Sequence, residues 1–128
     1  MKLVLVRHAD SAPGVPDELR TLTPAGREQA QRLAERFRAE GLEPDAVLTS
    51  PLLRARETAA GLGLGTPEPL DALAPGATED DLRAAVQGRG ETVVVVGHQP
   101  DCGRIAAAIA GGPEPAFPPA GFVVLDLR

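Results

Sequence analysis

Residues 2–10 read Lys2-Leu3-Val4-Leu5-Val6-Arg7-His8-Ala9-Asp10, and no other stretch constrains the architecture of this chain as strongly. The unbroken apolar run before Arg7 is typical of a strand that is buried on both faces inside a parallel sheet. Arg7 and His8 follow at its end. In open α/β sheets ligands bind beyond the carboxyl ends of the strands. We therefore expect this arginine and this histidine to lie in a functional site.

The second of the two histidines, His98, also follows an apolar run, Thr92-Val93-Val94-Val95-Val96-Gly97. A single histidine at a strand end is more often a hydrogen-bonded residue of the sheet rim than a catalytic group. Two histidines at equivalent places, the first with an arginine beside it, favour function. We expect the fold to bring the two imidazoles together.

The remaining pattern alternates helices with strands. Helix starts are predicted from N-cap residues at Thr23-Pro24, Ser50-Pro51 and Thr78, and a further helix is expected from about 100 to 110. Strands are expected at 45–49, 68–70, 92–96 and 121–127. This order predicts a single α/β domain over residues 1–128, a three-layer α/β/α sandwich. Its central sheet is mostly parallel, with helices on both faces and an antiparallel edge strand.

A further arginine, Arg54, is expected near the start of the helix that follows strand 45–49. Helix N-termini favour anions, and an arginine there adds a bidentate donor. Arg56 is interpreted as a solvent-exposed helix residue. Two arginines and two histidines around one point suit a tetrahedral phosphoryl group, with one imidazole as nucleophile and the other as hydrogen-bond donor. The sequence shows no carboxylate cluster, zinc spacing or nucleotide-binding loop, so we expect neither a metal nor a cofactor.

Composition excludes several classes of partner. The chain has 128 residues, a net charge of −5 and neither Tyr nor Trp, which argues against nucleic-acid and anionic-membrane surfaces. No apolar run approaches the length of a membrane span, and residues 2–6 are too few for a signal-peptide core, so we expect a cytoplasmic protein. The single cysteine, Cys102, is expected to be a core thiol.

Three motifs occur in a familiar order: Arg7-His8-Ala9, Ser50-Pro51-Leu52-Leu53-Arg54-Ala55-Arg56-Glu57-Thr58 and Gly97-His98. Together they resemble the histidine phosphatase (phosphoglycerate mutase-like) superfamily, and the short chain is most similar to its small phosphohistidine phosphatases of the SixA type. The resemblance covers residues 2 to about 127. It implies that His8 is the nucleophile, that Arg7 and Arg54 bind the phosphoryl group, and that His98 donates to it. Arg20 is expected to line the same pocket.

The chain departs from the family pattern at two places. Ala9 stands where the family usually has glycine, and we expect this methyl group to be tolerated. Many members carry a glutamate as general acid in a Leu-x-Glu stretch, where this chain has Ala72 in Leu70-Asp71-Ala72. The candidates to replace that acid are Asp71, Asp17 and Glu18.

The missing glutamate bears on the substrate. An alkoxide leaving group needs a proton, whereas phosphohistidine can expel a neutral imidazole. The prediction is therefore a metal-independent phosphatase that works through a phosphohistidine intermediate on phosphohistidine in proteins. The alternatives are a phosphatase for small phosphate monoesters, such as sugar phosphates or nucleotide-derived compounds, and a non-catalytic phosphate-binding module. The intact set Arg7, His8, Arg54 and His98 argues against the last.

Overall fold

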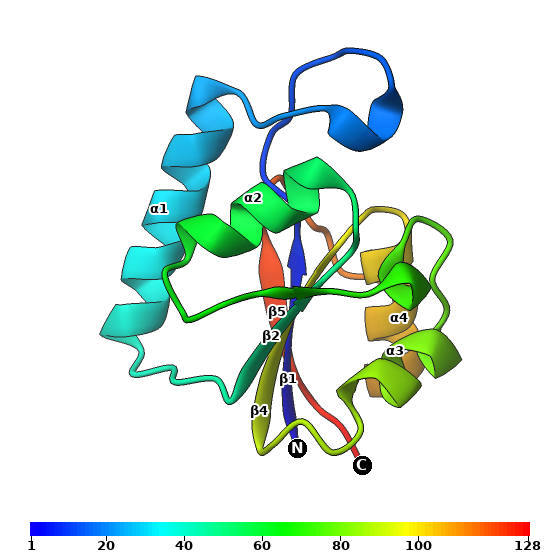
Figure 1. Cartoon of the computed structure of the whole chain (residues 1–128). Helices are drawn as coiled ribbons and strands as arrows, with labels where there is room; N and C mark the ends of the chain where they lie inside the picture. Colours follow the sequence, from blue (N-terminus) through cyan, green and yellow to red (C-terminus); the bar gives the residue numbers. More distant parts are fainter.

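The computed structural model describes residues 1–128 as a five-stranded sheet with helices on both faces (Figure 1). The strands are β1 (Lys2–Arg7), β2 (Ala46–Thr49), β3 (Glu68–Pro69), β4 (Thr92–Gly97) and β5 (Phe122–Asp126), in the spatial order β3-β2-β4-β1-β5. The first four run parallel, and β5 pairs antiparallel with β1 at one edge. The predicted α/β class, mostly parallel sheet and antiparallel edge strand are confirmed.

The helices divide between the two faces of the sheet. They are α1 (Pro24–Ala39), α2 (Leu53–Gly61), α3 (Glu79–Val86) and α4 (Asp101–Ala110), with short 3₁₀ turns at Asp17–Leu19 and Asp71–Leu73. In Figure 1, α1 lies on the left of the sheet, α2 crosses in front of its upper part, and α3 and α4 lie on its right. Helices α1 and α2 share one face, since both contribute to the same buried cluster. None of these helices combines the length and the apolarity that a membrane crossing requires.

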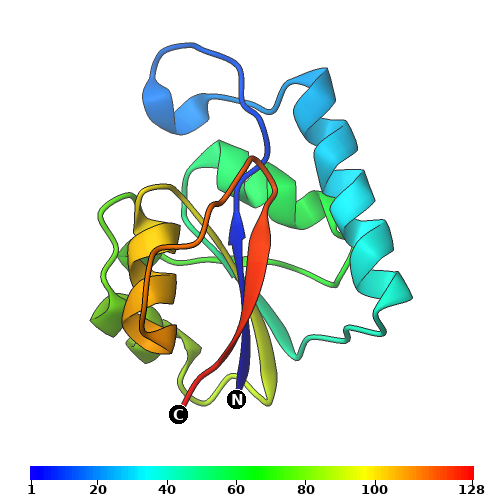
Figure 2. The same cartoon turned by 180° about the vertical axis from the view of Figure 1, so that it is seen from behind.

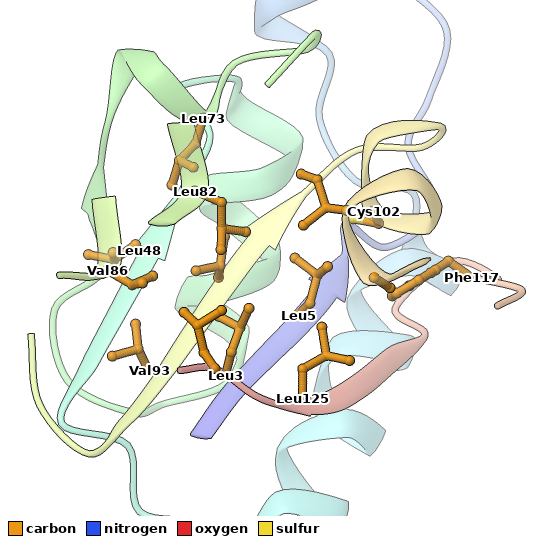
Figure 3. Packing of buried hydrophobic residues seen from close by; sticks show 14 residues of the cluster. Leu3, Leu5, Leu48, Leu73, Leu82, Val86, Val93, Cys102, Phe117 and Leu125 are labelled. Atoms are coloured by element: carbon orange, nitrogen blue, oxygen red, sulfur yellow. The ribbon is translucent and has the colours of Figure 1, made fainter. Parts of the chain in front are cut away.

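The apolar run of β1 is buried because its side chains alternate between two cores. Leu3 and Leu5 belong to a cluster of 14 buried residues that packs under α3 and α4 (Figure 3). Val4 and Val6 belong to a cluster of 11 buried residues on the face that α1 and α2 cover. Cys102 lies buried in the first cluster, as expected for a core thiol.

Strand register positions the two histidines. The parallel ladder pairs Arg7 of β1 with Gly97 of β4, so that His8 and His98 follow at adjacent strand ends. The backbone N–H of His8 donates to the Gly97 carbonyl at 2.9 Å, which extends the ladder by one bond. Both chain termini lie at the opposite end of the sheet, side by side (Figure 2).

One predicted helix start is wrong. Helix α2 begins at Leu53 and not directly after Ser50-Pro51, and its N-cap residue, Leu52, offers no side-chain cap. The Ser50 hydroxyl is engaged elsewhere, since it lies 2.7 Å from Nε2 of His98 and accepts the Leu52 N–H at 3.2 Å. Ser50, which follows strand β2, therefore contacts His98 and does not cap helix α2.

Candidate active site

The carboxyl ends of β1, β2 and β4 surround a pocket of about 290 Å³. Its lining comprises Arg7, His8, Ala9, Asp10, Ser11, Arg20, Arg54, Pro75, His98, Gln99 and Pro119. The four residues predicted as catalytic are thus brought together, and Arg20 joins them. Arg56 is exposed on α2, as predicted.

The ring of His8 is held in one tautomer. Its Nδ1 lies 2.7 Å from the Ala9 carbonyl oxygen. A carbonyl can only accept, so Nδ1 carries the hydrogen and Nε2 keeps its lone pair. Burial lowers the pKa of His8, and the charges of Arg54, Arg7 and Arg20 lower it further against the opposing effect of the Ala9 bond. His8 is therefore a neutral imidazole with a nucleophilic Nε2 at neutral pH.

A buried threonine ties the first strand end to α2. Thr58 Oγ1 accepts the Ala9 N–H at 2.9 Å and donates to the Arg54 carbonyl at 2.7 Å. Ala9 does not have the positive φ that would favour glycine, since Ala120 is the only non-glycine residue with a positive φ. Its methyl group therefore causes no backbone strain. Thr58 therefore couples the placement of His8 to that of Arg54.

Three guanidinium groups supply the positive charge of the pocket. Arg7 Nη1 donates to the Phe117 carbonyl at 2.9 Å, while its Nε is buried without a hydrogen-bond partner. An unpaired buried donor destabilises the fold. The side chain of Arg54 is only 8% exposed. Arg20 is fixed by bonds from Nε to the Ala12 carbonyl at 2.8 Å and from Nη2 to Ser11 Oγ at 3.1 Å.

The second histidine faces the first. The ring centroids of His8 and His98 are 5.1 Å apart. Burial lowers the pKa of His98 to about 3, helped by the neighbouring His8 and Arg54. His98 is thus neutral in the free protein. If the Ser50 hydroxyl donates to its Nε2, the ring hydrogen resides on Nδ1, and the neutral ring is then itself a hydrogen-bond donor.

Neither aspartate proposed as general acid is placed as a proton donor. Asp17 lies beside the pocket, but hydrogen bonds from Arg20 and then Arg54 hold its pKa below the usual range. Its carboxylate is ionised at neutral pH and can only accept. Asp71 is exposed in the second 3₁₀ turn and is not part of the pocket lining, to which that segment contributes Pro75.

Sequence reasoning missed the roles of several polar residues in the second motif. Ser50 contacts His98, and Thr58 contacts Ala9. Glu57 accepts from Thr21 Oγ1 at 2.6 Å and from the Leu22 N–H at 2.9 Å, which anchors the loop between β1 and α1 to α2. The available signal was the presence of three polar side chains, Ser50, Glu57 and Thr58, in and just before a short helix that packs on a buried sheet.

Comparisons with known proteins find relatives of this chain in both sequence and structure. A sequence model of the histidine phosphatase superfamily, branch 1, matches residues 3–75. An uncharacterised protein of Picosynechococcus sp. is 41% identical over 123 residues, which cover 88% of this chain and 74% of that protein. The phosphohistidine phosphatase SixA of Escherichia coli is 30% identical over 125 residues, or 90% of this chain and 78% of that protein. The solved structure of the protein histidine phosphatase SixA complexed with tungstate superposes with a TM-score of 0.89 at 27% identity, covering 99% of this chain and 88% of that one.

Proposed function

Since this chain belongs to the histidine phosphatase superfamily and is a SixA-like phosphatase, we propose that it hydrolyses phosphohistidine in proteins through a phosphoenzyme intermediate on His8. The observation that carries the proposal is the Nδ1 to Ala9 carbonyl contact, because it leaves Nε2 of His8 free to attack. No step requires a metal ion.

In the first step, Nε2 of His8 attacks phosphorus and the bond from phosphorus to the substrate nitrogen breaks. The electron pair of that bond moves to the substrate imidazole, which leaves. Arg7, Arg20 and Arg54 hold the phosphoryl oxygens, whose charge is best matched when the group flattens in a loose transition state. In the second step a water attacks phosphorus, the electron pair of the P–Nε2 bond returns to His8, and the water proton goes to the phosphate product.

His98 contributes a hydrogen bond to a phosphoryl oxygen in both steps. Its low pKa means that a neutral ring performs this role on first contact. The Ser50 hydroxyl lies 2.7 Å from Nε2, and when it donates to that nitrogen the Nδ1 hydrogen is available to the phosphoryl group. A bound dianion favours the protonated ring and strengthens the same bond.

The choice of phosphohistidine rests on the absence of a protonated acid. An alkoxide is strongly basic and needs a proton to leave, whereas imidazole has a conjugate acid of pKa about 6.5. The carboxylate beside the pocket, Asp17, is kept ionised by two arginines. Asp10, which also lines the pocket, accepts from Thr23 Oγ1 at 2.7 Å. With neutral histidines and carboxylates that accept hydrogen bonds, the site is suited to the better leaving group.

Two features support a protein substrate and an oxyanion ligand. Val15 and Leu19, which are 96% and 61% exposed, lie in the loop between β1 and α1 that rises beyond the end of the sheet and carries Arg20 (Figure 1). Exposed apolar side chains beside a polar pocket suit contact with a protein surface. The SixA structure, which matches nearly the whole chain, was solved with tungstate, a tetrahedral oxyanion like phosphate.

The test is a side-by-side turnover assay with EDTA present, using a histidine-phosphorylated phosphotransfer protein and a panel of alkyl phosphate monoesters. We expect turnover of the phosphoprotein and little of the alkyl esters. Rapid hydrolysis of alkyl esters would instead identify a metabolite phosphatase, and a requirement for metal would refute the mechanism.

A further inference from the structure

The carboxylate of Asp17 lies between two arginines of the pocket and has no part in the steps above. Its Oδ1 accepts from Arg20 Nη1 at 3.1 Å, and its Oδ2 accepts from Arg54 Nη2 at 3.2 Å. The main-chain oxygen of the same residue accepts from Arg54 Nη1 at 2.9 Å. Two phosphoryl-binding guanidinium groups therefore share one carboxylate.

Asp17 engages the outer end of the Arg54 guanidinium. Its two acceptors take one N–H each from Nη1 and Nη2. A guanidinium has five N–H donors, so three remain for a phosphoryl group. The carboxylate and the phosphoryl group can thus be present together, and binding of substrate does not require Asp17 to leave.

The same carboxylate retains capacity for another donor. Each of its oxygens receives one hydrogen bond and has a second lone pair. The side chain is 60% exposed, so it lies on the outer side of the arginines, toward solvent. Its charge also acts on His98, where it opposes the lowering of that residue's pKa. Because Nε2 of His8 attacks from within the pocket, an in-line leaving group departs toward the solvent side. Asp17, exposed and bonded to two arginines of the pocket lining, is the carboxylate we consider for this departing group.

We propose that Asp17 selects the leaving group by accepting the remaining ring N–H of a bound phosphohistidine, which keeps that imidazole protonated. This inference rests on the proposed function. When the P–N bond breaks, its electron pair goes to the nitrogen that held phosphorus, the ring becomes neutral, and the proton stays on the other nitrogen. No proton has to be delivered to the leaving group.

An alkyl ester gains nothing from this arrangement. Its leaving oxygen carries no hydrogen for the carboxylate to accept, and an ionised carboxylate has no proton to give it. Asp17 therefore favours P–N over P–O substrates. Its permanent negative charge prevents it from acting as a general acid and is also the property that makes it selective.

The test compares kcat/KM for free phosphohistidine with that for p-nitrophenyl phosphate, an activated ester whose leaving group needs no acid. Asp17→Asn removes the charge but keeps the main-chain bond to Arg54. We expect the ratio of phosphohistidine to ester turnover to fall about tenfold, the effect of one pK unit at the leaving imidazole. Glu18→Gln is the matched control, since this exposed neighbour undergoes the same loss of charge without a contact to either arginine; it should keep the ratio of the wild type.

A ratio in Asp17→Asn within about twofold of the wild type would overturn the inference. Loss of both activities in equal proportion would overturn it too, because Asp17 would then serve only to position Arg54. Wild-type protein that hydrolyses the ester but neither free phosphohistidine nor the histidine-phosphorylated phosphotransfer protein would refute the proposed function itself, whatever the variants do.

Discussion

Replacing Thr58 with valine removes the hydroxyl that joins the nucleophile to the second arginine. Thr58 is fully buried, and valine has nearly the same shape, so the loss of hydrogen bonds is the main change. The Ala9 N–H, which now donates to Thr58 at 2.9 Å, would be buried without a partner. Such an orphaned donor lowers the free energy of unfolding by about 1–3 kcal/mol. For a chain of 128 residues this corresponds to a melting temperature about 4–11 °C lower.

Urea unfolding followed by circular dichroism measures this loss, since the chain has no Trp or Tyr for fluorescence. Turnover of p-nitrophenyl phosphate should fall at least about tenfold in Thr58→Val, because the Ala9 carbonyl that orients His8 is no longer fixed. Thr58→Ser is the matched control, since it keeps the hydroxyl and loses one methyl group. A valine variant as stable and as active as the serine variant would refute the coupling.

Other variants test the arginines, the loop contact and the second histidine. Arg54→Lys should lose at least about 100-fold in kcat/KM although it keeps the charge, because an ammonium cannot reproduce the guanidinium fork; near wild-type kinetics would place Arg54 outside the site. In Gly26→Ala the new Cβ would overlap the Asp10 carbonyl oxygen, so urea unfolding should show a loss of about 1–3 kcal/mol. A variant as stable as wild type would contradict that close approach. The pKa of His98 is about 3 in the folded protein. As the pH falls, this histidine is therefore protonated in the unfolded chain at a higher pH than in the folded protein. The free energy of unfolding should therefore fall as the pH drops below about 6.5, and His98 contributes at most about 1.4 kcal/mol per pH unit to this fall. In urea unfolding measured at several pH values, His98→Gln should remove that contribution. An unchanged pH dependence in the variant would contradict the low pKa.

The order of strands and helices was predictable because local signals and burial agree. The run from Leu3 to Val6 is apolar at every position, since alternate side chains enter two different cores. Thr23 accepts from the Gly26 N–H as a helix cap, as its place before Pro24 indicates. Such features depend on neighbours a few residues apart, which the sequence displays directly.

The parts that were not predictable depend on partners far apart in the chain. The start of α2 was misplaced because Ser50 contacts His98, 48 residues away, and does not cap the helix. The nearby Arg20 and then Arg54, which is 37 residues away, keep the Asp17 carboxylate ionised, and the sequence did not indicate the contact with Arg54. Strand ends predicted that Arg7, His8, Arg54 and His98 would meet, but not which groups orient them.

The most direct measurement is to trap the phosphoenzyme. Wild-type protein is mixed with a radiolabelled histidine-phosphorylated protein and quenched in alkali during turnover, and the label is located by peptide mapping. We predict acid-labile, alkali-stable phosphate on Nε2 of His8, and none in a folded His8→Ala variant, which should also lack turnover. Label on another residue, or turnover by His8→Ala near that of the wild type, would contradict the assignment of His8 as the nucleophile.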